Sequence, residues 1–374
     1  MGLLRWFLYH RSSYDRIVIT LIPKPPIDSG MKRALPRGCE ICLKGGKLVL
    51  FVTGECDQSC FYCPLSEKRR GLDVVYADEV LVEDDLDVIL EGKAIDAEGT
   101  GITGGDPVLK PKRTIKYIKL LKDFFGKDHH IHLYTNGRHV NGDILRRLKE
   151  TGLDELRFHP QKEDWKKIEL AKNLGLYTGA EVPAIPRNEE WIRELIAYLV
   201  RVKADFLNLN QLEFCPQNAY QLKQRGFVLE KDSMTAALGS EEMAYSVIRW
   251  ADREGIDLPI HYCPSFVKDA IQTKNRLIRR SRNVSRPYEE ILSDGLLGKF
   301  IIRSTSVYPR TLKSFMARAL GTAPHMVNIS SDGISLEVPR AFVVGARRLL
   351  PDSKIVYVQE YPTAAREKIA EYPY

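Results

Sequence analysis

The sequence predicts an α/β fold, a partial (β/α)6 TIM-like barrel with an N-terminal extension and a small C-terminal α/β module. From Lys47 onward, short β-rich runs alternate with amphipathic helical stretches, which is the pattern of successive βαβ units around a parallel sheet. Hydrophobic residues make up 44% and charged residues 28% of the 374 residues, enough for a large buried core. No apolar run approaches the roughly 20 residues that span a bilayer.

The predicted barrel occupies residues 47–265 and contains six β/α repeats. The expected strands are Leu48–Thr53, Ala97–Thr103, Ile131–Thr135, Glu155–His159, Thr178–Val182 and Phe206–Leu212. The expected helices lie near residues 78–92, 111–125, 142–151, 162–175, 188–203 and 240–254. A seventh strand-like run, Leu258–Tyr262, either closes or extends the barrel. Active sites of such barrels lie at the carboxyl ends of the strands.

The flanking segments differ from the barrel in pattern. Residues 1–46 form an extension with a strand-like run at 16–22, a proline-rich stretch and a Cys-x-x-Cys pair. Its apolar start lacks a small-residue cleavage site, so we expect no signal peptide and a cytoplasmic protein. Residues 266–374 begin with a basic, helical stretch and continue as the small α/β module.

Three closely spaced cysteines directly follow the first predicted strand. Cys56, Cys60 and Cys63 lie within an eight-residue loop, in the pattern Cys-x-x-x-Cys-x-x-Cys. Iron–sulfur clusters prefer soft thiolate ligands, and three thiolates on a 4Fe-4S cube leave one iron open to a small chelating molecule. A zinc loop is the alternative, but zinc sites usually use paired Cys-x-x-Cys units.

This cysteine loop resembles the signature of the radical S-adenosylmethionine superfamily, and the layout is most similar to activating enzymes of the pyruvate formate-lyase type. The resemblance implies that the open iron binds S-adenosylmethionine. It implies that one electron from reduced ferredoxin or flavodoxin cleaves that cofactor to methionine and a 5′-deoxyadenosyl radical, which abstracts hydrogen from a substrate. Tyr62, the aromatic residue before the third cysteine, also fits the family pattern.

Further motifs of the family follow the later strands. Gly104, Gly105 and Asp106 resemble the Gly-Gly-Glu-Pro segment whose backbone receives the methionine amino group, with aspartate replacing glutamate. Thr135 and Asn136 lie in a Tyr-Thr-Asn-Gly sequence that the resemblance places near the nucleotide. His159 and Glu181 occupy positions that commonly meet the cofactor ribose or carboxylate. Substrate contact or a hydrogen-bonded structural role is the alternative for these last two.

The remaining four of the seven cysteines are Cys39, Cys42, Cys215 and Cys263. Together they would complete a second 4Fe-4S cluster or a zinc site. However, Cys39 and Cys42 precede the first strand, and the simplest placement is at the opposite end of the barrel from Cys215 and Cys263. The alternative is a separate Cys39/Cys42 knuckle, with Cys215 and Cys263 buried or facing substrate.

The positive charge is concentrated in one segment. Residues 268–286 contain seven Lys or Arg against one Asp, and so carry +6 of the net charge of +7. Arg279, Arg280 and Arg282 in this segment are candidate phosphate contacts, which suggests tRNA as one substrate. Modification of a protein or metabolite, with an auxiliary cluster, is a second hypothesis. A non-catalytic iron–sulfur electron carrier is a third, and the Gly104–Gly105 motif argues against it.

Overall fold

The computed structural model describes residues 35–303, 309–319, 321 and 323–374. Two compact units divide the chain: one contains residues 47–91 and 97–270 with the preceding helix, and the other contains residues 44–46, 92–96 and 271–374. The strand expected at residues 16–22 lies outside the described residues. We describe each unit by itself.

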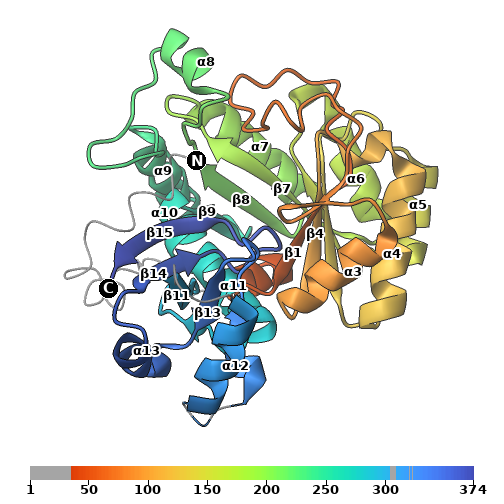
Figure 1. Ribbon diagram of the computed structural model, residues 1–374. Helices are drawn as coiled ribbons and strands as arrows, with labels where there is room; N and C mark the ends of the chain where they lie inside the picture. The colour runs from red at the N-terminus through yellow and green to blue at the C-terminus, as the bar shows by residue number, and fades with distance from the viewer. Residues whose placement is uncertain (1–34, 304–308, 320, 322) are drawn as a thin grey trace. The chain divides into compact units, whose positions relative to one another are not determined.

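The first unit is built on a curved sheet of parallel strands (Figure 1). Its parallel strands are β1 (Lys47–Phe51), β4 (Gly99–Thr103), β5 (His130–Thr135), β6 (Glu155–Phe158), β7 (Tyr177–Ala184), β8 (Phe206–Gln211) and β9 (Ile260–Cys263). They pair in chain order, and a short antiparallel hairpin of β2 (Tyr76–Ala77) and β3 (Val80–Leu81) extends the sheet beside β1. This confirms the partial TIM-like barrel, and β9 extends it as a seventh parallel strand.

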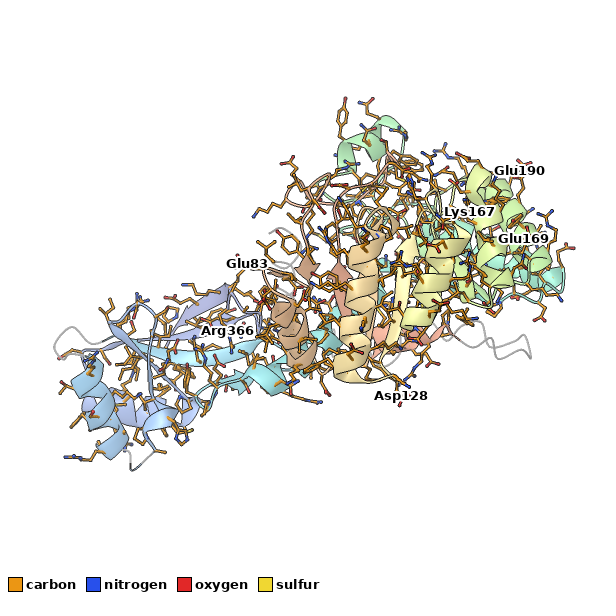
Figure 2. All side chains as sticks on the ribbon, turned by 90° about the vertical axis from the view of Figure 1, so that its right-hand side faces the viewer. Glu83, Asp128, Lys167, Glu169, Glu190 and Arg366 are labelled. Atoms are coloured by element: carbon orange, nitrogen blue, oxygen red, sulfur yellow. The ribbon has the colours of Figure 1, made fainter. Side chains whose placement is uncertain are left out.

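Helices follow most of these strands at the predicted places. They are α3 (Asp85–Ala94), α4 (Pro111–Phe125), α5 (Gly142–Thr151), α6 (Lys166–Asn173), α7 (Glu189–Arg201) and α9 (Ser240–Arg253). The sequence dictates the ends of α5, because the Asn141 side chain caps the first turn and Gly152 adopts a left-handed conformation with φ 107° at the last. Charged side chains such as Glu83, Glu169 and Glu190 face outward (Figure 2).

One predicted helix begins later than expected. The helix expected from residue 78 begins only at Asp85, because Asp78 takes a left-handed φ of 48° in the β2–β3 hairpin. The Asp87 carboxylate then accepts the backbone N–H groups of Glu83 and Asp84, which fixes the helix start. Cys39 and Cys42 lie on a short helix, α2 (Arg37–Leu43), for which no secondary structure was predicted.

The two faces of the parallel sheet differ in polarity. Alternate residues of β7 and β8, including Ala180, Val182, Leu207 and Leu209, are at most 2% exposed and form part of the core. The opposite face, here called the inner face, carries polar side chains at paired register positions. Its members include Tyr134, Arg157, Glu181, Asn208, Asn210, His261 and Cys263. Helix α2 lies against this face, where the Gly38 N–H donates to the Glu155 carboxylate at 3.2 Å.

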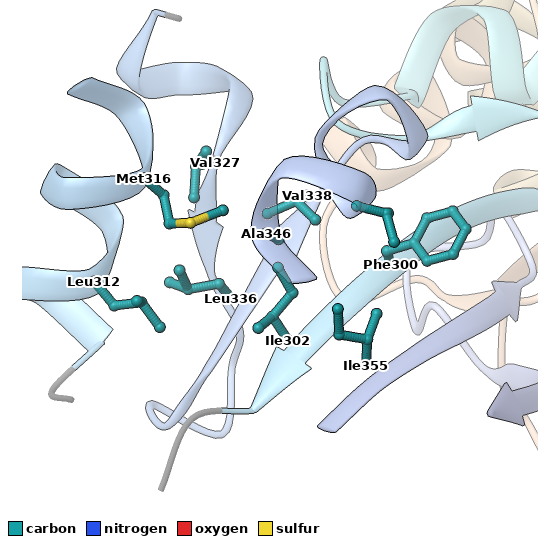
Figure 3. Packing of buried hydrophobic residues seen from close by; sticks show 10 residues of the cluster. Phe300, Ile302, Leu312, Met316, Val327, Leu336, Val338, Ala346 and Ile355 are labelled. Atoms are coloured by element: carbon teal, nitrogen blue, oxygen red, sulfur yellow. The ribbon is translucent and has the colours of Figure 1, made fainter. Parts of the chain in front are cut away.

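The second unit is a small antiparallel α/β module, as the sequence predicted. Its sheet contains β10 (Glu290–Ile291), β11 (Leu297–Arg303), β12 (Asn328–Ile329), β13 (Ser335–Val338), β14 (Lys354–Glu360) and β15 (Lys368–Pro373). Helices α12 (Pro309–Ala319) and α13 (Val343–Leu349) close a core in which Ile302, Leu312 and Leu336 are at most 1% exposed (Figure 3). The final strand, β15, was not predicted.

Helix α11 (Lys274–Val284) carries most of the basic segment, and its arginines serve the second unit itself. Arg280 is 6% exposed and donates to the Pro362 carbonyl at 2.5 Å. Arg279 donates to the backbone carbonyls of Ile95 and Asp96. Of the three candidate phosphate contacts, Arg282 is exposed, Arg279 is half-buried and Arg280 is buried.

Candidate active site

The three-cysteine loop leaves the carboxyl end of β1 and returns to the barrel through backbone hydrogen bonds. The Gly54 N–H donates to the Leu72 carbonyl, and the Gly71 N–H donates to the Gly54 carbonyl, both at 2.8 Å. Cys56 is exposed, whereas Cys60 and Cys63 are half-buried. The loop therefore presents three thiols on a surface that a bound group can reach.

Three thiols on one loop provide the soft donor set that iron–sulfur clusters prefer. Burial raises the pKa of the Cys56 and Cys60 thiols, so binding of a metal cluster would have to displace their protons. The donor set fits the 4Fe-4S cluster.

Gly104 and Gly105 let the end of β4 pack directly against this loop. The Gly105 N–H donates to the Thr53 carbonyl at 2.7 Å, and the Asp106 N–H donates to the Glu55 carbonyl at 2.8 Å. A Cβ atom at Gly104 would lie 2.5 Å from the Thr53 carbonyl oxygen. A Cβ atom at Gly105 would clash with the Glu55 carbonyl oxygen. Only glycine fits at these two positions.

Asp106 joins two of the predicted motifs. Its fully buried carboxylate accepts hydrogen bonds from the Val108 N–H at 2.8 Å and the Asn136 N–H at 3.0 Å. The Thr135 hydroxyl donates to the same carboxylate at 3.0 Å. Burial nevertheless raises the pKa of Asp106. Asp106 and Thr135 therefore brace the turns after β4 and β5.

Asn136 reaches the cysteine loop through a residue that the sequence analysis did not single out. Its side-chain amide donates to Asp57 Oδ1 at 2.9 Å, and the other Asp57 oxygen lies 2.8 Å from His139 Nε2. The position of Asp57 directly after Cys56 was the available signal. His139 offered none, because its contact with Asp57 joins segments 82 residues apart.

Tyr62 and His159 form a hydrogen-bonded pair beside the half-buried cysteines. The Tyr62 hydroxyl lies 2.8 Å from His159 Nε2, and His159 Nδ1 lies 2.9 Å from the Glu181 carbonyl oxygen. Because a carbonyl only accepts, Nδ1 carries the proton and Nε2 accepts from Tyr62. Burial lowers the pKa of His159, which favours this neutral form.

A cavity of about 480 Å³ opens beside the loop. Cys60, Tyr62 and His159 line it from one side, and Pro183 and Trp191 line it from the side of β7 and α7. These residues combine a thiol, a polar pair and apolar rings in one concave surface, which is typical of a small-molecule site. The remaining predicted residues brace this surface and are not part of its lining.

Glu181 lies on the inner face, two residues before Pro183, which lines the cavity. Its carboxylate lies 2.6 Å from Arg157 Nη1 and accepts hydrogen bonds from Asn208 at 3.0 Å and Asn210 at 2.9 Å. Burial opposes its ionisation, but Arg157 and the two amides outweigh burial and hold the pKa of Glu181 at about 2. The side chain is thus an ionised member of the inner-face network.

The four remaining cysteines lie on three segments. Cys39 and Cys42 lie on α2, against the inner face, and Cys263 ends β9 on that face. Cys215 lies in the segment after β8, where its N–H donates to Asn218 Oδ1 at 2.8 Å. The Asn218 amide in turn donates to the Tyr62 carbonyl at 3.0 Å. The backbone of Cys215 is thus connected through Asn218 to the first cysteine loop.

Comparison with known proteins agrees with this geometry. The family model of the radical SAM superfamily matches residues 50–164, from β1 to the segment after β6. A Methanocaldococcus jannaschii protein, provisionally named a glycyl-radical enzyme activating enzyme, is 48% identical over 276 residues, which cover 70% of this chain and 72% of that protein. The chain belongs to the radical SAM superfamily.

The similar solved structures are more distant in sequence. Streptococcus suis SuiB bound to S-adenosylmethionine is 13% identical, with a TM-score of 0.44 over 59% of this chain and 50% of that one. The protein anSMEcpe with bound AdoMet is 14% identical, with a TM-score of 0.40 over 57% of this chain and 60% of that one. The chain thus spans about half of SuiB.

As a radical SAM enzyme, the protein uses a 4Fe-4S cluster and S-adenosylmethionine. Cys56, Cys60 and Cys63 have the spacing and exposure to hold that cluster. No helix in the described residues has both the length and the apolar character to cross a membrane.

Proposed function

We propose that this radical SAM enzyme activates a partner protein by removing a hydrogen atom from a backbone glycine. The observation that carries the proposal is the cavity of about 480 Å³ that opens directly beside Cys60 and Tyr62. The 48% identity to a protein provisionally named a glycyl-radical enzyme activating enzyme supports this substrate class. Reduced ferredoxin or flavodoxin is the proposed electron donor.

When bound, the cluster and S-adenosylmethionine supply a one-electron cleavage that yields methionine and a 5′-deoxyadenosyl radical. The residues of the chain hold and shield this chemistry. Cys56, Cys60 and Cys63 provide the thiolates, and the backbone of Gly104 and Gly105 lies close enough to the loop to receive a small polar group. Trp191 and Pro183 provide apolar walls of the cavity.

The hydrogen balance of the proposed reaction is simple. One electron and one S-adenosylmethionine give one methionine and one 5′-deoxyadenosyl radical, which takes hydrogen from the glycine Cα. The products are 5′-deoxyadenosine and a glycyl radical on the partner. No second oxidant is required.

The proposal is tested anaerobically with the holoenzyme, dithionite, S-adenosylmethionine and a glycine-containing peptide deuterated at Cα. We expect 5′-deoxyadenosine that contains deuterium from the peptide, and an organic radical signal in the EPR spectrum. Cys60→Ala should abolish both. Deuterium-free 5′-deoxyadenosine from a fully loaded enzyme, with every glycine peptide tried, would count against a glycine substrate while leaving the radical SAM chemistry intact.

The tRNA hypothesis receives no support from the second unit, since Arg279 and Arg280 donate to backbone carbonyls. A metabolite- or peptide-modifying enzyme with an auxiliary cluster remains the second candidate. The observation that favours it is the set of cysteines on the inner face.

A further inference from the structure

Three thiols from two distant parts of the chain face the interior of the barrel. Cys39 and Cys42 are three residues apart on α2, so their side chains share one side of that helix. Cys263 pairs with Asn210 in the β8–β9 ladder, which places both side chains on the inner face. All seven cysteines of the chain are thiols, with no disulfide.

Direct contacts connect these thiols to a single network. Cys39 Sγ lies 3.3 Å from Asn208 Nδ2 and 3.4 Å from Arg157 Nη2. Asn208 also donates to Glu181, which accepts a second hydrogen bond from Asn210, the partner of Cys263 in the ladder. Cys39 and Cys263 are therefore connected to Glu181 through Asn208 and Asn210, two inner-face residues of the same strand.

Cationic side chains lie around the same network. The Arg157 guanidinium contacts Cys39 and forms an ion pair with Glu181. Lys268, which follows Cys263 in the chain, forms an ion pair with Glu213 after β8. The thiols therefore lie in a region that also contains cations.

We propose that Cys39, Cys42 and Cys263 bind a second 4Fe-4S cluster inside the barrel. Thiolates are the ligands that such clusters prefer, and a cysteine followed by proline, as at Cys263, recurs in cluster loops. The inner face supplies cations, Lys47, Arg157 and Lys268, that offset the negative charge of a thiolate-bound cluster.

The proposed site has three cysteine ligands, whereas the sequence suggested four. The Cys215 N–H donates to Asn218, whose amide donates to the Tyr62 carbonyl of the first cysteine loop. We therefore leave Cys215 out of the proposed site, which is independent of the substrate that the enzyme modifies.

Substitution of the cysteines of one site at a time distinguishes the two clusters. A Cys56→Ala/Cys60→Ala/Cys63→Ala variant, reconstituted anaerobically, should retain about four iron atoms per chain, against about eight in the wild type. Adding Cys263→Ser or Cys39→Ser to this variant should remove the remaining iron and its Mössbauer signal. Adding Cys215→Ser, the matched control, should leave both unchanged.

Circular dichroism spectra of every variant establish that iron loss does not reflect misfolding. An iron-free but folded three-alanine variant would overturn the proposal, as would one equivalent of zinc in place of iron. Loss of the remaining iron on Cys215→Ser would overturn the three-cysteine assignment. None of these outcomes depends on 5′-deoxyadenosine formation. The iron measurements therefore test the second cluster even if the proposed glycine chemistry fails.

Discussion

His159 holds one tautomer because its two ring nitrogens meet groups of opposite hydrogen-bonding character. The Glu181 carbonyl can only accept, and the Tyr62 hydroxyl then donates to the other nitrogen. Through this pair the cysteine loop is connected to His159, which follows β6, and to Glu181 in β7. Strands β6 and β7 are neighbours in the sheet. A single hydroxyl thus contributes to the orientation of the loop.

Tyr62→Phe is expected to lower the free energy of unfolding of the cluster-free protein by about 1–3 kcal/mol, because it leaves a buried acceptor on His159 without its donor. Chemical denaturation measures the change. Tyr220→Phe is the matched control, since Tyr220 is 70% exposed and should show no change. Equal stability of Tyr62→Phe and wild type would contradict the hydrogen bond.

His129 predicts a pH dependence of stability. Burial, followed by the Lys122 charge, lowers the pKa of His129 to about 4, and His129 Nε2 lies 2.8 Å from the Thr100 hydroxyl. Between about pH 6.5 and pH 4 the unfolded chain therefore binds a proton that the folded protein does not, and stability falls as the pH is lowered. His129→Gln should remove about 1–3 kcal/mol of that fall in denaturation experiments at pH 7 and pH 4.5. An unchanged pH slope would show that His129 is not the titrating group.

At the scale of elements, the segment between β8 and α9 packs against the cysteine loop. Its buried residues Leu212, Phe214, Leu222 and Ala237 pack against Phe61 and Tyr62. The Phe61 and Phe227 rings stack with centroids 6.0 Å apart. Asn218, which is 2% exposed, adds a hydrogen bond to the Tyr62 carbonyl between Cys60 and Cys63. Helix α8 (Ala219–Gln224) of this segment is visible above the sheet in Figure 1.

Asn218→Ala should loosen the first cluster without removing any of its ligands. We expect iron release to a chelator to accelerate about fivefold or more, because a buried carbonyl and a buried N–H lose their partner. Lys223→Ala on the same helix is exposed and serves as the control. Unchanged release kinetics in Asn218→Ala would mean that the segment does not restrain the loop.

Sequence patterns located the parallel strands and the motifs that follow them, because hydrophobic alternation and glycine-rich turns are local properties. They could not show which groups the Glu181 carboxylate contacts, since Arg157 and Asn208 come from neighbouring strands. The placement of α2 was missed for a similar reason. Its contacts with Glu155 and Asn208 join residues more than 100 positions apart.

At the scale of the whole molecule, the second unit is not continuous in sequence. Residues 92–96, which include the last turn of α3, belong to it, and they accept hydrogen bonds from α11. Arg279 donates to the Ile95 carbonyl at 2.9 Å, and Asn283 donates to the Ala94 carbonyl at 3.1 Å. Cutting the chain before residue 271 would remove these partners from α11.

Residues 271–374 expressed alone should therefore show weaker protection of the α11 amides in hydrogen exchange than the full chain does. Protection of the β11–β14 pair, which lies wholly within the fragment, should change less and provides the internal control. Equal protection of α11 in both proteins would show that residues 92–96 contribute nothing to its stability.

The two-faced sheet has a consequence for how such an enzyme can diversify. Residues that hold the barrel together, such as Leu207 and Leu209, alternate along one strand with inner-face residues, such as Asn208 and Asn210. A lineage can therefore exchange inner-face side chains, and with them the chemistry of the interior, without disturbing the neighbours that maintain the fold. Substitutions at every second position of the strands would then change the side chains of the inner face while the fold is kept.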